Sequence, residues 1–567
     1  MELVDIIDVI VCIVYCMALI VLSFISERIK SPKWKLLHLL VPIGALLITK
    51  HGPDWALLPL YIGSVIALCG FFTEKDKLRR ILALAGAVCM AFSFPTCIFG
   101  KQYRAKSYLR DFEKMFDTMR EHYVLTEHKG IDWDALYDKY EPQFRDIDRR
   151  QDAGANALAW GAFCGEFHDG HVSYTCNYSD VDAQNKAIND ALGNDYGLSV
   201  MHCSDGSFVA VNVDERLAEY GIRNGTVITA WDGKAPDEVS RTSPLFGSSL
   251  FTYDKAFDTI PIRLDSCPDI DNEIFSSGLL CGGIGGDSVE VTFISKNGSE
   301  QTAELPVAGK YCDRLADTMA ILNQGVNVGN LQWKKVGDTT ACLRIKGMSY
   351  DSKSYSSADD SAYDEMKDEI REKLAEYQSE GVTDVIIDLR DNNGGSPHMV
   401  NGIVSMFAPK GEHYCLTNCV WDDENKCWAK NEDGSYVRGN DITFDGEQLL
   451  GDGRVIVIVN SNSVSAADMM TKEMEALDNA TVIGFTGPNG SSQAVGYTTS
   501  DTGSLCFSNC VVLDEDGSIM IDSGTDRQSS DGDGVTIIPF DSEAVKALFD
   551  NGEDYLLSKA LSMLEHE

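Results

Sequence analysis

The amino-acid sequence predicts a multi-domain protein, in which an N-terminal all-α membrane segment precedes a larger part of mixed α+β and α/β structure. Three observations predict this organisation. The chain has 567 residues, which is too long for one ordinary domain. Its first hundred residues contain long apolar runs. The remainder alternates short β-branched runs with amphipathic stretches of helical period.

Four apolar runs predict the membrane segment, residues 1–100. The first, third and fourth approach the length of a helix that spans a bilayer, whereas the second is short and polar in places. An acidic N-terminus and the later apolar runs argue against a cleavable signal peptide. The runs lie at residues 6–24, 36–49, 55–72 and 81–100.

The placement of lysine and arginine predicts an orientation. Basic clusters at 28–35 and 75–80 lie between apolar runs, and the positive-inside tendency assigns these loops to the cytoplasm. Four spans then place both termini outside. We therefore expect a multi-pass protein of the cell membrane, with membrane lipid around its N-terminal helices and an extracytoplasmic C-terminal part. If the run at 36–49 does not span, the C-terminal part is cytoplasmic instead.

Charge and cysteine usage limit the partners and cofactors. The formal net charge is −39, and its acidic excess lies beyond residue 100, so the surface repels nucleic acid. Among 17 cysteines, Cys164/Cys176 and Cys506/Cys510 are near pairs and candidate disulfides, although sequence does not decide the pairing. No CxxC tandem or HExxH motif is present, so we predict neither a metal nor a cofactor. The oligomeric state stays open.

Residues 101–190 predict a helical subdomain that ends in the motif D-G-H-V. Apolar residues recur at three- and four-residue spacings over about 107–164. His171 then lies in a turn before a short strand, and the glycine beside it allows the close approach that a histidine base requires. His168 and Glu166 are rivals for that role. A solitary histidine in a turn is more often a surface or hydrogen-bonding residue.

Residues 191–307 predict a β-rich domain. Strand patterns follow in the order Y-G-L-S-V, F-V-A-V-N-V, T-V-I-T-A-W-D-G-K and V-E-V-T-F-I-S-K-N-G, with a glycine-rich insert near 244–286. This order is similar to that of PDZ domains, in which such a loop and strand bind the end of an extended peptide by strand addition. A small β-barrel without a ligand is the alternative interpretation.

Residues 308–567 predict a mixed α/β core. Open α/β sheets carry their sites at the carboxyl ends of strands. Gly394 and Gly395 follow the strand V-T-D-V-I-I-D-L-R, and Ser465 follows the buried run V-I-V-I-V. Because a helical pattern begins just after Ser465, free N–H groups point toward an oxyanion beside its hydroxyl. The same serine also suits an ordinary N-cap, and the glycine pair also suits a tight turn.

Seven motifs in one order carry a resemblance to a known family. Over about residues 104–567 the chain resembles the carboxyl-terminal processing peptidases, or tail-specific proteases, and their tricorn-core relatives. This resemblance implies a serine peptidase with a polypeptide substrate. The motifs are G-I-D-W-D-A-L, D-G-H-V, the PDZ-like segment, D-V-I-I-D-L-R-D-N-N-G-G, V-I-V-N-S-N-S-V-S-A-A-D, V-I-G-F-T-G and D-G-V-T-I-I-P-F-D.

The resemblance implies the nucleophile and the oxyanion hole. The family's nucleophile is the serine before the alanine of its signature, which here is Ser465 of S-A-A-D. Its oxyanion hole uses the backbone N–H of the following residue, here Ala466, together with one N–H from the glycine pair, Gly394 or Gly395.

The proton acceptor departs from the processing-peptidase pattern. Where those enzymes carry a lysine, this chain reads F-T-G-P-N-G-S-S at 485–492 and has none. Tricorn-type relatives use a histidine that precedes the catalytic sheet, and His171 has the matching place. A histidine titrates near neutrality, so it can deprotonate Ser465 and later protonate the leaving amine. The same relatives imply an acidic residue before the late G-V, here Asp531, with Asp533 as its rival.

These features together predict a membrane-anchored serine endopeptidase. It would cleave extended or C-terminal polypeptide segments through an acyl-enzyme on Ser465, with a histidine base in place of the family lysine. One alternative is a catalytically degenerate homologue that acts as a membrane-bound peptide-binding or sensor protein. Another places the function in the spans, as a transporter or a signalling element.

Overall fold

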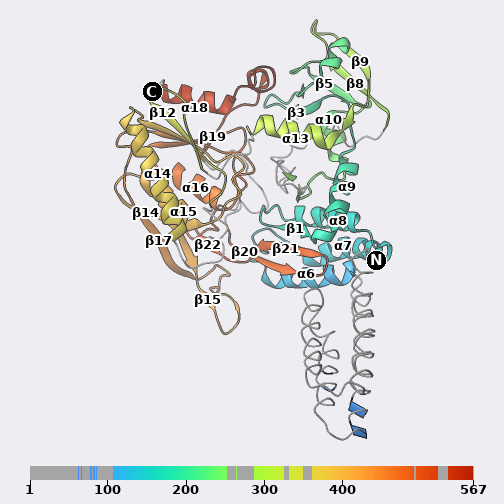
Figure 1. The fold of residues 1–567 in the computed structure, drawn as a ribbon, viewed down its shortest axis with the longest axis vertical. Helices are drawn as coiled ribbons and strands as arrows, with labels where there is room; N and C mark the ends of the chain where they lie inside the picture. Colours follow the sequence, from blue (N-terminus) through green and yellow to red (C-terminus); the bar gives the residue numbers. More distant parts are fainter. Residues whose placement is uncertain are drawn as a thin grey trace, which may run out of the picture. The chain divides into compact units, whose positions relative to one another are not determined.

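The computed structural model describes most of the chain beyond residue 105 and a few isolated positions between 62 and 85. Residues 1–107 and 108–567 form two separate compact units, and the following description concerns the second (Figure 1). The continuous described segments are 106–251, 263–264, 286–324, 331–348, 361–490, 493–521 and 534–565.

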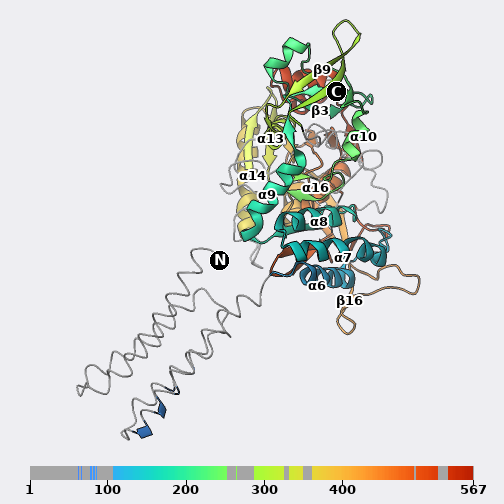
Figure 2. The ribbon, with the colours of Figure 1, turned by 90° about the vertical axis from the view of Figure 1, so that its right-hand side faces the viewer.

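Three helices begin the second unit: α6 (Tyr108–His122), α7 (Trp133–Arg150) and α8 (Ala153–Gly165). Aspartates cap α7 and α8, because their carboxylates accept the backbone N–H three residues later. Figure 2 shows the three helices side by side. They pack around a buried aromatic cluster, in which Phe112 and Phe144 stack with their ring centroids 4.2 Å apart.

The strand β1 (Ser173–Cys176) joins this helical part to the C-terminal half of the chain. It pairs antiparallel with β21 (Gly503–Ser508), which pairs on its other edge with β20 (Val495–Thr499). Leu505 and Phe507 of β21 pack into the aromatic cluster. Segments far apart in the sequence therefore share one hydrophobic core.

The β-rich part has its own core, to which Trp231, Val291 and Leu305 contribute buried side chains. β3 pairs with β4, β8 pairs with both β5 and β9, and all these pairs are antiparallel. Its strands are β2 (Asn194–Asp195), β3 (Ser199–His202), β4 (Phe208–Val211), β5 (Ile228–Trp231), β6 (Leu250–Phe251), β7 (Arg263–Leu264), β8 (Ser288–Ile294), β9 (Glu300–Pro306) and β10 (Gly309–Lys310). Its helices are η3 (Tyr178–Asp180), α9 (Val181–Leu192), η4 (Glu215–Tyr220), α10 (Pro236–Arg241) and α13 (Tyr311–Leu322).

A six-stranded sheet forms the centre of the C-terminal part. β11 runs antiparallel to β12, and the other neighbouring strands are parallel. The carboxyl ends of β13 and β18 lie side by side, where such sheets carry their sites. In spatial order the strands are β11 (Leu331–Lys335), β12 (Thr340–Ile345), β13 (Asp384–Asp388), β18 (Val455–Ile458), β19 (Ala480–Gly484) and β23 (Val535–Ile537).

Helices cover both faces of this sheet (Figure 1). Val385 and Ile387 of β13 pack against the first helical layer, while Ile386 between them packs against the second. Because both of its faces are buried, β18 is a continuous apolar run. The first layer contains α14 (Ser361–Ser379), α15 (Pro397–Phe407) and α16 (Ala466–Glu475). The second contains α17 (Ser542–Val545), η6 (Lys546–Asp550) and α18 (Tyr555–Glu565).

A smaller sheet lies beyond the first helical layer. Its central strand, β14 (Gly411–Cys419), pairs antiparallel with β17 (Arg438–Gly446) and β22 (Val512–Leu513). A short hairpin of β15 (Trp421–Asp422) and β16 (Cys427–Trp428) follows β14.

The predicted four-span membrane segment and the multi-pass cell-membrane localisation are corrected by this structure. Among the residues it describes, no helix combines the length and the apolar character needed to cross a bilayer. The long helices α7 and α14 carry charges along their whole length, so neither offers the roughly 20 apolar residues of a span. The predicted runs within 6–100, and the lipid contact inferred from them, fall almost wholly outside the described residues.

The candidate disulfides are not formed. Cys164, Cys176, Cys506 and Cys510 are all free thiols. Cys506 lies in β21, and its partner across the sheet in β1 is Ser173 rather than Cys510.

Candidate active site

Ser465 lies at the turn between β18 and α16. Its φ is +65° and its ψ is −116°, a conformation that residues other than glycine rarely adopt and that costs of order 1–3 kcal/mol. Its N–H donates a 2.6 Å hydrogen bond to Asp468 Oδ2, while Asp468 Oδ1 accepts the N–H of Gly490 at 2.7 Å. Asp468 therefore fixes the first turn of α16 and holds Ser465, which is half-buried, at the carboxyl edge of the sheet.

Gly394 lies directly against this turn. It has a φ of +82°, and a Cβ at this position would lie 2.6 Å from the Ser465 Cβ and 2.9 Å from the Ala466 nitrogen. Only glycine permits so close an approach. A second contact closes the same junction, because the Val464 N–H donates to the Asn392 carbonyl at 2.9 Å.

The two glycines differ in the state of their N–H groups. The Gly394 N–H donates to Asn392 Oδ1 at 2.9 Å and is thus already engaged. Within the described part of the chain, neither the Gly395 N–H nor the Ala466 N–H donates a hydrogen bond. Gly395 is held in place by Met348, whose N–H donates to the Gly394 carbonyl at 2.8 Å. Of the predicted oxyanion donors, Gly395 and Ala466 therefore each keep an N–H that has no hydrogen-bond partner among the described residues.

The buried carboxylate of Asp169 holds the D-G-H turn. Asp169 Oδ1 accepts the His171 N–H at 2.9 Å. Asp169 Oδ2 accepts the hydroxyls of Tyr123 at 3.0 Å and Ser508 at 2.9 Å. His171 itself is 8% exposed. Since Tyr123 follows α6 and Ser508 ends β21, both the helical and the C-terminal parts determine where His171 lies.

The loop after β19 connects the D-G-H turn with the segment that precedes Ser465. The Asn489 N–H donates to the Ser463 carbonyl at 2.9 Å, and its Nδ2 donates to the Ser461 carbonyl at 3.2 Å. On its other side lies Gly170, at which an added Cβ would be 1.5 Å from Asn489 Oδ1. The Asn489 side chain therefore contacts both Gly170, the neighbour of His171, and the loop that precedes Ser465.

The two rivals of His171 have other contacts. Glu166 pairs with Lys139 and accepts the Tyr140 hydroxyl at 2.7 Å, so its carboxylate is engaged within the helical part. The carbonyl of His168 accepts the Lys129 ammonium at 2.8 Å.

The predicted acidic partner cannot be placed against the histidine, because Asp531 and its rival Asp533 fall outside the described residues. The described chain resumes at Gly534, where an added Cβ would lie 1.7 Å from Glu475 Oε1 at the end of α16. In the part of the chain that is described, no group of three or more His, Cys, Asp or Glu side chains is arranged to hold a metal ion.

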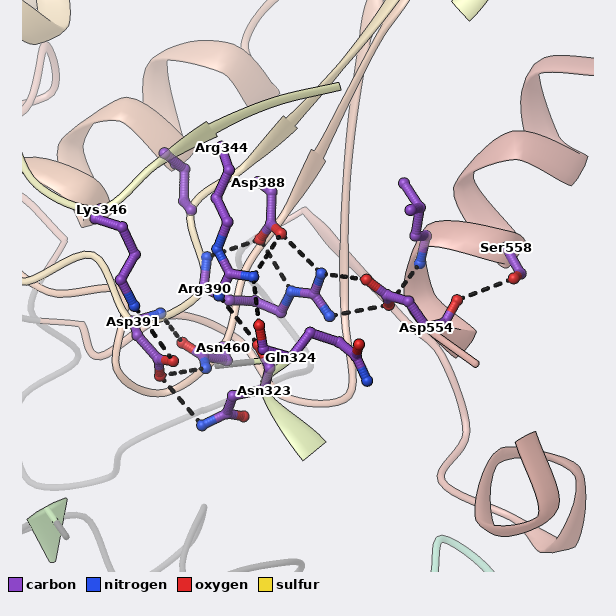
Figure 3. Close-up of polar contacts among 12 residues, drawn as sticks. Asn323, Gln324, Arg344, Lys346, Asp388, Arg390, Asp391, Asn460, Asp554 and Ser558 are labelled. Carbon is purple, nitrogen blue, oxygen red and sulfur yellow. Dashed lines mark hydrogen bonds and ion pairs between the residues drawn. The ribbon is translucent and has the colours of Figure 1, made fainter. Parts of the chain in front are cut away.

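Lys346 is a basic group near the glycine pair that the sequence motifs did not indicate. Its ammonium lies 3.9 Å from the Asp391 carboxylate (Figure 3). Burial lowers the pKa of Lys346, and Asp391 opposes this change. Asp391 Oδ1 also accepts amide N–H groups from Asn323 and Asn460, each at 3.1 Å. The lysine follows a strand as I-K-G-M, which is too common a pattern to indicate a role.

A buried ion network supports the same loop. Arg390 is 2% exposed and donates to both carboxylate oxygens of Asp388 and of Asp554 (Figure 3). Burial raises the pKa of the Asp388 carboxyl, but the guanidinium groups of Arg390 and Arg344 outweigh it and hold that pKa below its ordinary value. The network ties the end of β13 to the start of α18.

Comparison with known protein families identifies the class of enzyme to which this arrangement of residues corresponds. The model described as Peptidase family S41 matches residues 339–527, a range that includes the glycine pair and Ser465. The model described as Tricorn protease C1 domain matches residues 104–153, which contain α6 and α7. The protein is therefore a serine peptidase that acts on polypeptide, and its residues 339–527 match the model of peptidase family S41. The resemblance to processing peptidases and tricorn relatives is confirmed.

Solved structures of CPAF share the fold at low sequence identity. Mature CPAF is 14% identical, with a TM-score of 0.50 over 80% of this chain and 96% of that one. A mutant of CPAF is also 14% identical, with a TM-score of 0.50 over 81% and 97% of the two chains. The photosystem II D1 C-terminal processing protease is 15% identical, with a TM-score of 0.31 over 80% and 100%. Among curated protein sequences, none matches this chain.

Proposed function

We propose that the protein is an endopeptidase that cleaves extended or C-terminal polypeptide segments through an acyl-enzyme on Ser465. The observation that carries the proposal is the close approach of Gly394 to the Ser465–Ala466 turn. An oxyanion formed beside the Ser465 hydroxyl would lie near both the helix N-terminus and the glycine turn. Such preorganised donors are commonly the largest contribution to acyl transfer.

The proposed reaction has two halves. Ser465 Oγ attacks the scissile carbonyl carbon while its proton passes to His171, and the oxyanion accepts the N–H groups of Ala466 and Gly395. Collapse of this intermediate breaks the C–N bond, and the amine leaves with the proton from His171. Water then hydrolyses the ester by the same route in reverse. We favour Gly395 over Gly394 as donor because Asn392 already accepts the Gly394 N–H.

His171 is proposed as the general acid and base. Two features support this role: Asp169 fixes the backbone of its turn, and Asn489 contacts both its neighbour Gly170 and the loop of Ser465. Asp531 is proposed to orient the imidazole, with Asp533 as the alternative.

Residues 191–307 are proposed to capture the substrate as a PDZ-like module. The support is a set of short antiparallel strands with its own core, because the edge of such a sheet can accept an extended peptide as a further strand. A substrate bound there by its peptide end would present the rest of its polypeptide to the peptidase core.

The proposal is tested with the purified full chain and an unstructured protein substrate. Wild type should release peptides, and Ser465→Ala should reduce the rate at least about 10³-fold, because nucleophile loss removes most of the catalysis. Equal cleavage by both proteins would refute the proposal. His171→Ala should slow labelling by a fluorophosphonate, whereas labelling at the wild-type rate would remove only the base assignment.

One observation favours a second candidate, a degenerate homologue that binds peptide ends. The loop in which processing peptidases carry a lysine contains Asn489, which cannot accept a proton from the nucleophile. This candidate predicts peptide binding by the full chain, no fluorophosphonate label and no cleavage.

A further inference from the structure

Asn489 occupies the junction of two turns that the proposed chemistry requires. Its side chain is 1% exposed. One face of the amide is bound to the nucleophile loop, through the Ser461 carbonyl, and the other meets Gly170. The backbone of the same residue donates to Ser463. A fully buried amide with contacts on both sides holds two segments at a fixed spacing better than an apolar side chain does, because its hydrogen bonds fix its orientation.

The residue that follows extends this connection to the nucleophile itself. The Gly490 N–H donates to one oxygen of Asp468, and the Ser465 N–H donates to the other. A displacement of the loop that carries Asn489 would therefore also move the carboxylate that caps α16. Both ends of the proposed proton transfer depend on this loop.

We propose that Asn489 is a positioning residue, which holds the turn that carries His171 at a fixed distance from the turn that carries Ser465. The amide acts as a spacer and a link rather than as a base. The inference rests on the proposed function, because the spacing affects catalysis only if His171 exchanges a proton with Ser465. In this chain the loop that lacks the family lysine therefore positions His171 instead of supplying the base itself.

The close contact with Gly170 makes the inference testable by a double-mutant cycle. The φ of Gly170 lies outside the left-handed range, so alanine there is opposed by the contact with Asn489 and not by the backbone conformation. Gly170→Ala should force the two turns apart. If the obstacle is the Asn489 side chain, Asn489→Ala should remove most of the cost. Gly309→Ala is the matched control, since its Cβ would meet no atom closer than 4.0 Å.

The four proteins and the control are compared on the unstructured substrate and by fluorophosphonate labelling. Asn489→Ala should lower kcat at least tenfold with KM changed less than threefold, because small displacements of reacting groups mainly affect the chemical step. Its labelling should be slower but should reach the wild-type endpoint, which shows that the active fraction is unchanged. Gly170→Ala should cost at least 30-fold in wild type, but less than threefold in the Asn489→Ala background. Gly309→Ala should match wild type.

Two results would overturn the inference. One is an Asn489→Ala kcat within twofold of wild type. The other is an equal cost of Gly170→Ala in both backgrounds, since the side chains would then act independently. Ser465→Ala distinguishes failure of the proposed function: if that variant cleaves like wild type, the chemistry is wrong whatever Asn489 does. If His171→Ala labels at the wild-type rate while Asn489→Ala is slow, the spacing serves another group and the inference fails.

Discussion

Ser465 combines a strained backbone with a capped helix start. Its positive φ is disfavoured for a side chain with a Cβ, and the Asp468 carboxylate accepts the Ser465 N–H at the start of α16. Strain of this kind persists where the surroundings impose it. We interpret it as a cost in stability that keeps the hydroxyl beside the two open N–H groups.

This interpretation predicts the relative stabilities of two inactive variants. Ser465→Gly relieves the strain, whereas Ser465→Ala retains it. In urea denaturation we expect the glycine variant to exceed the alanine variant by about 1 kcal/mol in unfolding free energy, after the entropic cost of glycine. An alanine variant as stable as the glycine variant would show that the turn is not strained.

Gly394 provides a second prediction at this scale. In Gly394→Ala the Cβ would lie 2.5 Å from the Val464 carbonyl oxygen, so the nucleophile turn must shift. We expect kcat/KM to fall by about 100-fold or more. Gly434→Ala is the control, because Gly434 has a similar φ of +88° but open space around it, and it should keep full activity. Equal losses in both variants would contradict the steric account.

Sequence motifs predicted a site at Ser465 and the glycine pair, but not which of the two glycines keeps an N–H without a partner among the described residues. That distinction depends on the Asn392 side chain, which folds back onto Gly394 and also donates to the Ile345 carbonyl at 2.9 Å. Such a turn geometry has no periodic signature, so the two glycines are equivalent in sequence.

At the scale of elements, α16 begins directly after Ser465, the proposed nucleophile, and carries a buried acid, Glu473. Burial raises the pKa of Glu473 to about 7, although Cys415 and Lys472 act in the opposite direction. The Cys415 thiol donates to Glu473 Oε1 at 2.9 Å, and Oε2 accepts no hydrogen bond from the described residues.

The raised pKa predicts a pH-dependent stability. The folded state holds this proton more tightly than the unfolded state, so unfolding free energy should fall as pH rises from about 4.5 to about 7, by up to roughly 3 kcal/mol. Glu473→Gln should remove this component and should therefore be more stable relative to wild type at pH 8 than at pH 4.5. Denaturation midpoints at both pH values measure the effect, and identical pH profiles would contradict it.

Helix and strand patterns predicted where the elements lie, but they did not predict the contacts between the elements. The apolar run at 455–459 predicted a buried strand, and β18 is buried on both faces. The link from Gly170 to Asn489 joins two loops of no regular period, so no local pattern indicates it.

At the scale of the whole molecule, the edge of the sheet that carries the proposed site is linked to α18 by an ion pair. Arg390 follows the strand β13, and Asp554, which it binds, lies 164 positions later at the start of α18. Removing one partner of a buried ion pair leaves uncompensated charge in the interior.

Arg390→Met should therefore lower the unfolding free energy by about 3–5 kcal/mol. The control is Arg149→Met, whose partner Asp146 is half-exposed on α7, and it should change stability by less than about 1 kcal/mol. Thermal or denaturant unfolding of both variants measures the difference. Similar small losses in the two would show that the Arg390 network does not hold α18 to the sheet.

The sequence predicted the order of the helical, β-rich and α/β parts, but not how they depend on one another. β1 completes a sheet with β21, and β21 side chains enter the core of the first helices. These contacts join segments that lie far apart in the sequence, and pairing over such separations leaves no trace in local periodicity. The membrane segment was predicted from the apolar runs within 1–100, and that prediction rested on hydropathy alone.

The central claim is that Ser465 is the nucleophile of a serine peptidase, and covalent labelling tests it most directly. The full chain is incubated with a fluorophosphonate, and its mass and labelled peptide are determined. We predict one adduct per chain, on Ser465, with none in Ser465→Ala and slow formation in His171→Ala. An unlabelled wild-type chain, or an adduct at another serine, would contradict the account.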